Sequence, residues 1–396
     1  MARSRSEGCP KWKVETGLDA LVRSDFAPLR GQRVGVISNP TGVDTSYRHL
    51  VDIMHAHGGL DIAGVFGPEH GFRGSAQAGG SEGAGTDART GLTVYDAYGA
   101  TRAKWEQMFT AARVETVVFD IQDVGARFYT YIWTMYDSMR AAAKLGLRYV
   151  VADRPNPVGG TPKGPLMTPE YTSDVGKREI VQQHGMTIGE LGRFYQGEFI
   201  DAELTLEVLR CQGWRREMVA GDTGLPWVMP SPNMPTPDTA LVYPGTGMFE
   251  GVADISEGRG TTRPFELIGS PDLDYHWCDR LNDRGLSGVE FREAYFSPTF
   301  HKFAGQLCAG VEVKVTDPRT FDPVAAAVAM LIDARGTFTW RRDDWDPVRP
   351  FWIDKLTGSS RLRTMIDAGA GLEEVVGAWV GELSAFTKRR EKYLLY

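Results

Sequence analysis

Residues 116–152 read TVVFDIQDVGARFYTYIWTMYDSMRAAAKLGLRYVVA, which is the pattern of a strand, a helix and a second strand. The two ends, Thr116–Ile121 and Arg148–Ala152, are almost continuously apolar, as is typical of strands buried on both faces of a sheet. In the middle, apolar residues recur every three or four positions, which predicts an amphipathic helix of about four turns that stops near Gly146. The recurring residues are Phe128, Tyr131, Ile132, Met135, Met139, Ala142 and Ala143. A strand, a helix and a strand in sequence predict a right-handed crossover and a parallel sheet.

The same alternation of strand and helix occurs earlier in the chain. Arg33–Ser38 (RVGVIS) predicts the first strand, Ser46–His57 its helix and Ile62–Phe66 the second strand. We therefore expect an N-terminal domain of the α/β class, with the open parallel sheet of a Rossmann-like fold.

A proline-rich segment, Leu225–Pro244, separates this pattern from the rest of the chain. Proline lacks an amide proton and fixes its φ angle, so the segment cannot hold regular structure for long. Because 396 residues exceed one ordinary core, we predict a Rossmann-like domain over residues 14–235 and a smaller α+β domain over residues 236–396. The elements expected in the second domain are a strand at Gly310–Thr316 and helices at Pro323–Arg335 and Leu372–Lys392.

Charge and cysteine content exclude several classes of protein. The formal charge of −7 is spread along the chain, so nucleic acid is not expected as a partner. The four cysteines, Cys9, Cys211, Cys278 and Cys308, lie far apart and form neither a zinc motif nor a disulfide framework. We expect them to be reduced and buried.

The N-terminal residues Met1–Lys13 are polar and basic and lack the apolar run of a signal peptide. No other window approaches the roughly 20 apolar residues of a membrane span. We therefore expect a cytoplasmic protein with no membrane partner, and a homodimer is compatible with the sequence.

Polar and ionisable residues follow each predicted strand of the first domain. In open α/β sheets ligands bind outside the carboxyl ends of the strands, because loops and helix N-termini converge there. The residues at these four positions are Asn39, Pro40 and Thr41; Glu69 and His70; Asp120, Gln122, Asp123 and Arg127; and Asp153, Arg154 and Asn156. This coincidence predicts a functional site along one edge of the sheet.

Each of these residues also has a purely structural interpretation. Asp120 or Asp153 can cap a helix or form a turn, and a single residue of this kind is more often a cap than a catalyst. His70 and His184 can be half-buried histidines with satisfied hydrogen bonds, and Arg127 can open its helix beside a loop carboxylate. Caps do not require all four strands to end in ionisable groups, so we favour the functional interpretation.

Motifs that the sequence lacks narrow the chemistry. The chain has no G-x-G-x-x-G after a strand, no Walker A sequence, no G-x-S-x-G and no H-E-x-x-H. Four carboxylates (Glu69, Asp120, Asp123 and Asp153) could hold a hard cation such as Mg²⁺, but the interleaved arginines oppose a second positive charge. We therefore predict neither a cofactor nor a metal ion.

Several acids bordered by arginines suit the cleavage of a glycoside bond in an anionic sugar. One carboxylic acid donates a proton to the leaving oxygen, and a second carboxylate acts as base or nucleophile. Arginine pairs best with a carboxylate on the sugar itself, because its planar fork matches that group.

Seven segments of the chain resemble one family, the exo-β-N-acetylmuramidase family of glycoside hydrolases. They are GVISNPTGVD (35–44), FGPEHGFRG (66–74), VFDIQDVGARFYTYI (118–132), DRPNPVGG (153–160), QHGMTIGEL (183–191), SPNMPTPDTALVYPGT (231–246) and SEGRGTTRPFE (256–266). The match runs from about Gly17 to the C-terminal YLLY. It implies a Rossmann-like domain, a smaller C-terminal domain and a cleft between them that releases non-reducing terminal N-acetylmuramic acid from peptidoglycan (muropeptide) fragments.

The resemblance also implies roles for residues of this chain. Glu69 is expected as the catalytic acid and Asp120 or Asp123 as the second carboxylate, with Glu257 as an alternative. The residues expected to bind substrate are His70, Gln122, Arg127, Tyr129, Asp153, Arg154, Asn156, His184, Asn233, Glu257 and Arg259. The chain departs from the family at Glu250–Asp254, where Glu-Gly-Val-Ala-Asp replaces the expected Glu-Gly-Thr-Asn.

Two other classes of function remain open on sequence grounds. One is a metal-dependent cell-wall amidase or phosphatase, and the other is a non-catalytic amino-sugar binding protein with two lobes around a cleft. The stereochemical course of glycoside hydrolysis is also open, because the distance between carboxylates on different loops is not encoded in their spacing along the chain.

Overall fold

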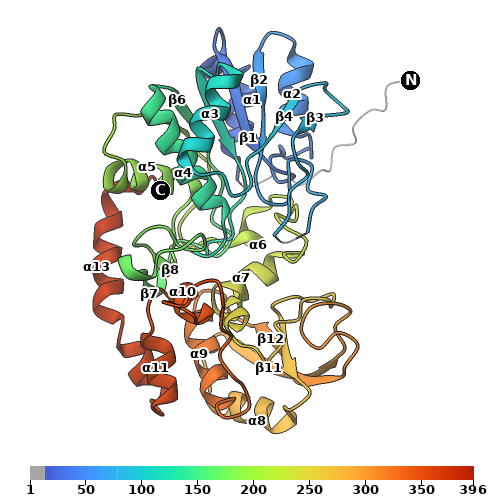
Figure 1. Ribbon diagram of the computed structural model, residues 1–396, viewed down its shortest axis with the longest axis vertical. Helices are drawn as coiled ribbons and strands as arrows, with labels where there is room; N and C mark the ends of the chain where they lie inside the picture. Colours follow the sequence, from blue (N-terminus) through green and yellow to red (C-terminus); the bar gives the residue numbers. More distant parts are fainter. Residues whose placement is uncertain (1–13, 78) are drawn as a thin grey trace.

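The computed structural model describes residues 14–77 and 79–396, and its N-terminal half is built on a seven-stranded sheet (Figure 1). The strands lie in the order β3-β4-β2-β1-β5-β6-β9, and all pairs are parallel except β3 with β4. Their bounds are β1 Arg33–Ser38, β2 Asp61–Gly67, β3 Gly85–Thr86, β4 Thr93–Asp96, β5 Thr116–Asp120, β6 Arg148–Ala152 and β9 Thr205–Leu209. The order reverses at β1, between β2 and β5, as in doubly wound dinucleotide-binding folds. The predicted Rossmann-like sheet is confirmed.

Helices cover both faces of this sheet. On one face α1 and α2 pack on Val34, Val36 and Val118, and on the other α3, α4 and α5 pack on Val117 and Phe119. The helices of this half are α1 Gly17–Arg23, α2 Leu50–His57, α3 Arg102–Ala112, α4 Tyr131–Leu145, α5 Ile188–Phe199 and α6 Ala220–Thr223, with short 3-10 turns η1 Ala27–Leu29 and η2 Pro169–Tyr171. A small hairpin of β7 Lys163–Leu166 and β8 Val181–Gln183 lies below the sheet.

Two of the predicted helices begin later than expected because their first residues have other hydrogen-bond partners. Ala126 pairs with Gln183 of β8, the Arg127 amide donates to the carbonyl of Gln182, and residues 127–130 form turns, so α4 begins only at Tyr131. In the second case, the Asp44 carboxylate accepts bonds from the amides of Ser46 and Arg48, which holds a turn before α2. The predicted stop of α4 at Gly146 is confirmed, with φ of 68°.

The C-terminal half is an α+β unit around a three-stranded antiparallel sheet in the order β10-β12-β11. Its strands are β10 Leu267–Ser270, β11 Val289–Phe296 and β12 Cys308–Val315. Its helices are α7 Pro237–Thr246, η3 Gly247–Gly251, α8 Tyr275–Asp283, α9 Pro323–Asp333, α10 Trp352–Thr357, α11 Arg361–Asp367, α12 Leu372–Gly377, α13 Val380–Arg390 and η4 Glu391–Tyr393. A separate core forms here, in which α8 packs on β11 and β12, and α9 packs on α7, α8 and α12.

Two sequence expectations for this half were wrong in detail. The proline-rich segment carries a ten-residue helix, α7, because Pro237 occupies the first helical position, where no amide partner is needed. The long helix expected over Leu372–Lys392 is two helices, α12 and α13, and Trp379 between them is buried in the core.

The end of the chain returns to the first half, where α13 and the C-terminus lie beside α5 (Figure 1). Phe386 and Tyr393 join the core of the N-terminal sheet. The last residue, Tyr396, donates its hydroxyl to Asp153 at 2.6 Å, directly after β6. The C-terminal segment therefore ties the two halves together.

Cys211, Cys278 and Cys308 are buried and free, as predicted, whereas Cys9 and the segment Met1–Lys13 lie outside the described residues. Across residues 14–77 and 79–396, we find no helix with the length and apolarity needed to cross a bilayer.

Candidate active site

A cavity of about 220 Å³ lies where the carboxyl edge of the sheet faces the C-terminal half, and we call it the central cavity. It is lined by Glu69, His70, Phe128, Tyr129, Thr130, Tyr131, Val175, Ser231, Asn233, Met234, Tyr243, Glu250, Arg259, Phe265 and Trp352. These residues come from the loops after β2 and β5, the proline-rich segment, α7, η3, the loop before β10, and α10. Five residues expected from the sequence meet here: Glu69, His70, Tyr129, Asn233 and Arg259.

Glu69 follows β2 and presents a half-buried carboxylate to the cavity. The hydroxyl of Thr130 donates to its Oε2 at 2.7 Å, and the amide of Gly79 donates to its Oε1 at 3.0 Å. Among the described residues, no Lys, Arg or His nitrogen lies within 4.0 Å of this carboxylate. Glu69 is therefore held by neutral donors from two different loops.

His70 turns the chain sharply after Glu69, with a φ of 69° in the left-handed region. Its ring Nδ1 lies 3.0 Å from the carbonyl oxygen of Ala76, and its amide donates to the carbonyl of Gly80 at 2.9 Å. These bonds fold the loop of residues 70–84 back on itself. The fold brings the amide of Gly79 to Glu69, so His70 acts on the site through the loop as well as lining the cavity.

Three of the six aromatic residues that line the central cavity are tyrosines, Tyr129, Tyr131 and Tyr243. Tyr129 packs edge-to-face on both Tyr131 and Tyr243, at centroid distances of 5.3 and 5.7 Å. Burial raises the pKa of the Tyr243 hydroxyl, and the negative charges of Glu250 and Glu69 raise it further. The pKa of Tyr129 is also raised, first by burial. Both hydroxyls therefore stay protonated and can donate hydrogen bonds to a ligand.

The wall from the C-terminal half carries Glu250 and Arg259. The Nη2 of Arg259 donates to Glu250 at 2.6 Å, and its Nε lies 3.3 Å from the buried Glu257. The guanidinium also stacks over Phe265, 4.9 Å from the ring centroid. No partner for Nη1 occurs among the described residues, so this nitrogen can bind a ligand.

Glu257 is fully buried beneath this wall and does not reach the central cavity. Burial alone would raise its pKa, but His301, Lys302 and Arg259 outweigh that effect and hold the pKa at about 2. Lys302 Nζ lies 2.9 Å from Oε2, and His301 Nδ1 lies 3.2 Å from Oε1. Glu257 thus anchors the arginine that faces the cavity.

We expect acid to destabilise the protein through Glu257. Its folded-state pKa is depressed from 4.5 to about 2, so its contribution is complete above pH 4.5 and is lost as the pH falls toward 2. The loss is roughly 3 kcal/mol, at about 1.36 kcal/mol per pKa unit. Urea unfolding across this range should show a steeper decline for wild type than for Glu257→Gln. Glu290→Gln, at an exposed position on β11, is the control, and parallel curves for wild type and Glu257→Gln would contradict the assignment.

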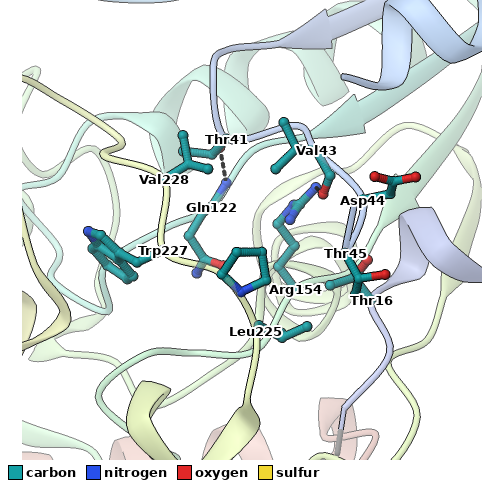
Figure 2. A pocket seen from close by; sticks show the side chains of 11 residues that line it. Thr16, Thr41, Val43, Asp44, Thr45, Gln122, Arg154, Leu225, Trp227 and Val228 are labelled. Atoms are coloured by element: carbon teal, nitrogen blue, oxygen red, sulfur yellow. Dashed lines mark hydrogen bonds between the residues drawn. The ribbon is translucent and has the colours of Figure 1, made fainter. Parts of the chain in front are cut away.

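Asp120, Gln122 and Arg154 lie elsewhere, at the switch point of the sheet, and Figure 2 shows Gln122 and Arg154 there. Arg154 binds both oxygens of the fully buried Asp120, at 2.5 and 3.0 Å, and donates to the carbonyl of Val43. Gln122 and Arg154 line a separate cavity of about 30 Å³, closed by the segment Leu225–Val228. A space of this size holds little more than a water molecule. Related folds bind dinucleotides at this position, but here the segment Leu225–Val228 closes the space to about 30 Å³.

Asp123, His184 and Asn156 form a buried polar cluster below the loop that follows β5. Asp123 Oδ2 accepts from the amide of Gly125 at 2.6 Å and lies 3.0 Å from His184 Nε2. Asn156 donates to the carbonyl of Met186 at 2.9 Å and accepts from the amide of Val158. All three side chains are buried and none lines the central cavity. They fix the loop from which Tyr129 and Thr130 reach the cavity.

Arg127 is also fully buried, away from the cavity. Its guanidinium donates to three backbone carbonyls, those of Pro165 and Ile180 in the small hairpin and that of Leu356 in α10. Burial lowers its pKa to about 9. Arg127 therefore joins the two halves of the chain next to the site, and because its Nη groups are bonded and its Nε is buried, no donor of Arg127 reaches the central cavity.

Asp153, like Arg127, is fully buried and holds separate segments of the chain together. It has no exposed surface, and it accepts bonds from the amides of Arg154 and Gly189 and the hydroxyls of Thr187 and Tyr396. Burial raises its pKa to about 6, although these donors oppose the rise. Asp153 thus joins β6, the start of α5 and the C-terminus.

Sequence reasoning missed Glu250, Thr130 and Tyr243. None of them directly follows a strand, which was the signal used to select candidates. Tyr243 and Thr130 lie in segments quoted for the family resemblance, and Glu250 lies in the loop noted as unlike the family. Within residues 14–77 and 79–396, no three His, Cys, Asp or Glu side chains converge closely enough to hold a metal ion.

Comparison with known proteins places the whole chain in one family. Models described as the N-terminal and C-terminal domains of the exo-β-N-acetylmuramidase NamZ match residues 34–238 and 241–396. The peptidoglycan β-N-acetylmuramidase NamZ of Bacillus subtilis (strain 168) is 44% identical over 396 residues, which cover 99% of this chain and 94% of that protein.

Two crystal structures of DUF1343 family proteins from Bacteroides fragilis have the same fold. One is 32% identical with a TM-score of 0.88 and covers 98% of this chain and 100% of its own. The other is 28% identical with a TM-score of 0.75 and covers 97% and 99%. Sequence and structure together show that this chain belongs to the NamZ family of exo-β-N-acetylmuramidases.

Proposed function

We propose that this protein is an exo-acting glycoside hydrolase that releases non-reducing terminal N-acetylmuramic acid from peptidoglycan fragments. The observation that carries the proposal is that two carboxylates, Glu69 and Glu250, and an arginine with a free donor, Arg259, line one cavity of about 220 Å³. Acid, second carboxylate and anion-binding group are the three parts that cleavage of an anionic amino sugar requires. The name of the Bacillus subtilis relative describes the same activity.

The surroundings of the two carboxylates suggest different roles. Glu250 is paired with Arg259, the only arginine that lines the central cavity among the described residues. Glu69 has only neutral partners, Thr130 and Gly79, and it lines both the central cavity and the cavity that continues from it past Thr130 and Trp352. We assign Glu69 as the acid that protonates the leaving oxygen. Glu250, rather than Asp120 or Asp123, becomes the second carboxylate, as base, as nucleophile or as partner of the sugar's acetamido group.

Arg259 is the arginine that we assign to the lactyl carboxylate, the group that distinguishes N-acetylmuramic acid from N-acetylglucosamine. Arg127 and Arg154 were equal candidates on sequence grounds, but neither lines the central cavity: Arg127 binds backbone carbonyls in the interior, and Arg154 binds Asp120 beside the small cavity at the switch point. The free Nη1 of Arg259 leaves room for one more charge-assisted bond.

The proposed function predicts release of one monosaccharide at a time from a chain end. The matching family model is named for an exo-acting enzyme, and Ser231, Asn233 and Met234 of the proline-rich segment wall one side of the central cavity. The test is digestion of a defined muramyl-terminated tetrasaccharide with chromatography of early products, together with turnover of a chromogenic N-acetylmuramide. Internal fragments at early times would contradict the exo mode.

The same assay separates the remaining classes of function. A binding protein gives no turnover of the chromogenic N-acetylmuramide, and a metal-dependent amidase or phosphatase loses its activity in chelator and regains it with a divalent ion. Proton NMR of the first anomer released decides between retention and inversion. The expected cytoplasmic location and the homodimer stay predictions, which cell fractionation and light scattering would check.

A further inference from the structure

Two further cavities extend from Glu69, away from Arg259. The inner one, of about 280 Å³, shares Glu69, Thr130, Val175 and Trp352 with the central cavity. The outer one, of about 640 Å³, shares Asp137, Asp174 and Lys177 with the inner one. Shared walls make a continuous path from the central cavity through the inner to the outer cavity, which we call the leaving-side groove. Because Glu69 lines both the central and the inner cavity, a bond cleaved beside it places one sugar in each.

The two parts of the groove differ in chemistry. The inner cavity presents aromatic surface, including Tyr98, which is 42% exposed, and the half-buried Trp352. Such surfaces stack against the apolar faces of sugar rings. The outer cavity carries four basic side chains, Arg102, Arg140, Lys177 and Arg349, against two acidic ones, Asp137 and Asp174. Each of these cations has an acidic neighbour: Arg102 pairs with Glu106, Arg349 with Asp346, Arg140 with Asp137, and Lys177 with Asp137 and Asp174. The outer cavity therefore presents a network of ion pairs rather than a net positive charge.

The outer cavity also has an exposed aromatic side chain. Trp345 is 68% exposed, and the ammonium group of the buried Lys355 lies 3.7 Å from its ring centroid. Lys177 lies 2.6 Å from Asp137, on the second turn of α4, and 3.6 Å from Asp174, and these ion pairs hold its ammonium group at the junction of the two cavities. An exposed tryptophan beside several cations matches a ligand with a sugar ring and a negative charge.

We propose that the leaving-side groove binds the rest of the glycan chain and recognises its alternation of neutral and anionic sugars. This inference rests on the proposed function. The neutral N-acetylglucosamine next to the scissile bond occupies the inner cavity against Tyr98 and Trp352. The following N-acetylmuramic acid lies in the outer cavity, where its lactyl carboxylate pairs with Lys177 and its ring stacks on Trp345. The enzyme therefore reads a second anionic sugar, two residues beyond the one that it releases.

The test compares three substrates that fill successive parts of the groove. These are an aryl N-acetylmuramide, the muramyl-glucosamine disaccharide and the corresponding tetrasaccharide. For wild type, kcat/KM should rise from disaccharide to tetrasaccharide. Lys177→Gln and Trp345→Ala should each lower kcat/KM on the tetrasaccharide by roughly tenfold, the scale of a lost charge pair or stacked ring, and leave the aryl glycoside within about twofold.

Matched controls and thermal melting keep the outcome interpretable. Lys388→Gln on α13 and Tyr275→Ala on α8 remove the same kinds of side chain at exposed positions away from the groove. No change in the tetrasaccharide-to-disaccharide ratio in folded Lys177→Gln and Trp345→Ala would overturn the proposed subsite and leave the proposed function standing. If wild type fails to cleave the aryl glycoside and both oligosaccharides, the proposed function itself fails and the subsite falls with it.

Discussion

Glu69→Gln should lower kcat on a natural muramyl disaccharide by roughly a hundredfold or more, the scale expected for a lost general acid. The amide cannot transfer a proton to the leaving oxygen, but it keeps the size and shape of the side chain. Its carbonyl oxygen can still accept the bond from the Gly79 amide, and its NH2 group can donate to the Thr130 hydroxyl, so the fold and the loop after His70 should persist. Steady-state kinetics and a thermal melt of the variant measure both parts of this expectation.

The leaving group distinguishes proton donation from other roles of Glu69. An aryl glycoside with a good leaving group needs little protonation, so the variant should lose less activity on it than on the disaccharide. Glu203→Gln, on the surface between α5 and β9, is the control and should behave as wild type. Near-normal kcat of Glu69→Gln on the disaccharide would exclude Glu69 as the acid, and the assignment would then pass to Glu250.

The strand pattern predicted the sheet and the edge on which the site lies, because buried parallel strands have a strong apolar signal. β1 and β6 have the predicted bounds, and Glu69 lies on a loop after a strand, as expected. The reasoning used the position of a residue along the chain as a proxy for where its side chain points. That proxy holds for Glu69, which lies beyond β2 and extends into the cavity.

For Asp120, Asp153 and Arg127, position along the chain did not indicate where the side chain points. None of the three lines the central cavity. Their partners are remote in sequence: Arg154 for Asp120, the C-terminal Tyr396 for Asp153, and carbonyls of the small hairpin and α10 for Arg127. No local pattern indicates that a strand-end carboxylate meets a partner more than two hundred residues away, as happens for Asp153. A buried ion requires such partners, so ionisable residues at strand ends can serve the fold as well as catalysis.

Glu250 is the opposite case: it lines the central cavity, but no sequence pattern selected it. It lies in η3, outside any strand end, and becomes a candidate only because α7 and η3 bring it opposite Glu69 and beside Arg259. Glu69 and Glu250 line the same cavity only because the two halves of the chain pack together, and no single segment of the sequence contains both residues.

Arg259→Met should raise KM for an aryl N-acetylmuramide by about thirtyfold or more, which corresponds to the roughly 2 kcal/mol of a buried charge-assisted pair. The effect on the matching N-acetylglucosaminide should be small, because that sugar has no lactyl carboxylate. The ratio of the two kcat/KM values is the decisive measurement, since damage to the fold or to Glu250 lowers both.

Two companion variants test whether the geometry of Arg259 matters as well as its charge. Arg259→Lys keeps a positive charge but loses the planar fork that reaches Glu250, Glu257 and a ligand at once, so it should restore only part of the preference. Arg263→Met removes a nearby arginine that pairs with Glu266 outside the central cavity, and it should leave the ratio unchanged. If Arg259→Met loses activity equally on both sugars, the arginine supports the wall of the cavity without reading the substrate. Recognition of the lactyl group must then come from donors such as Asn233 or the tyrosine hydroxyls, which bind without a charge and discriminate less strongly.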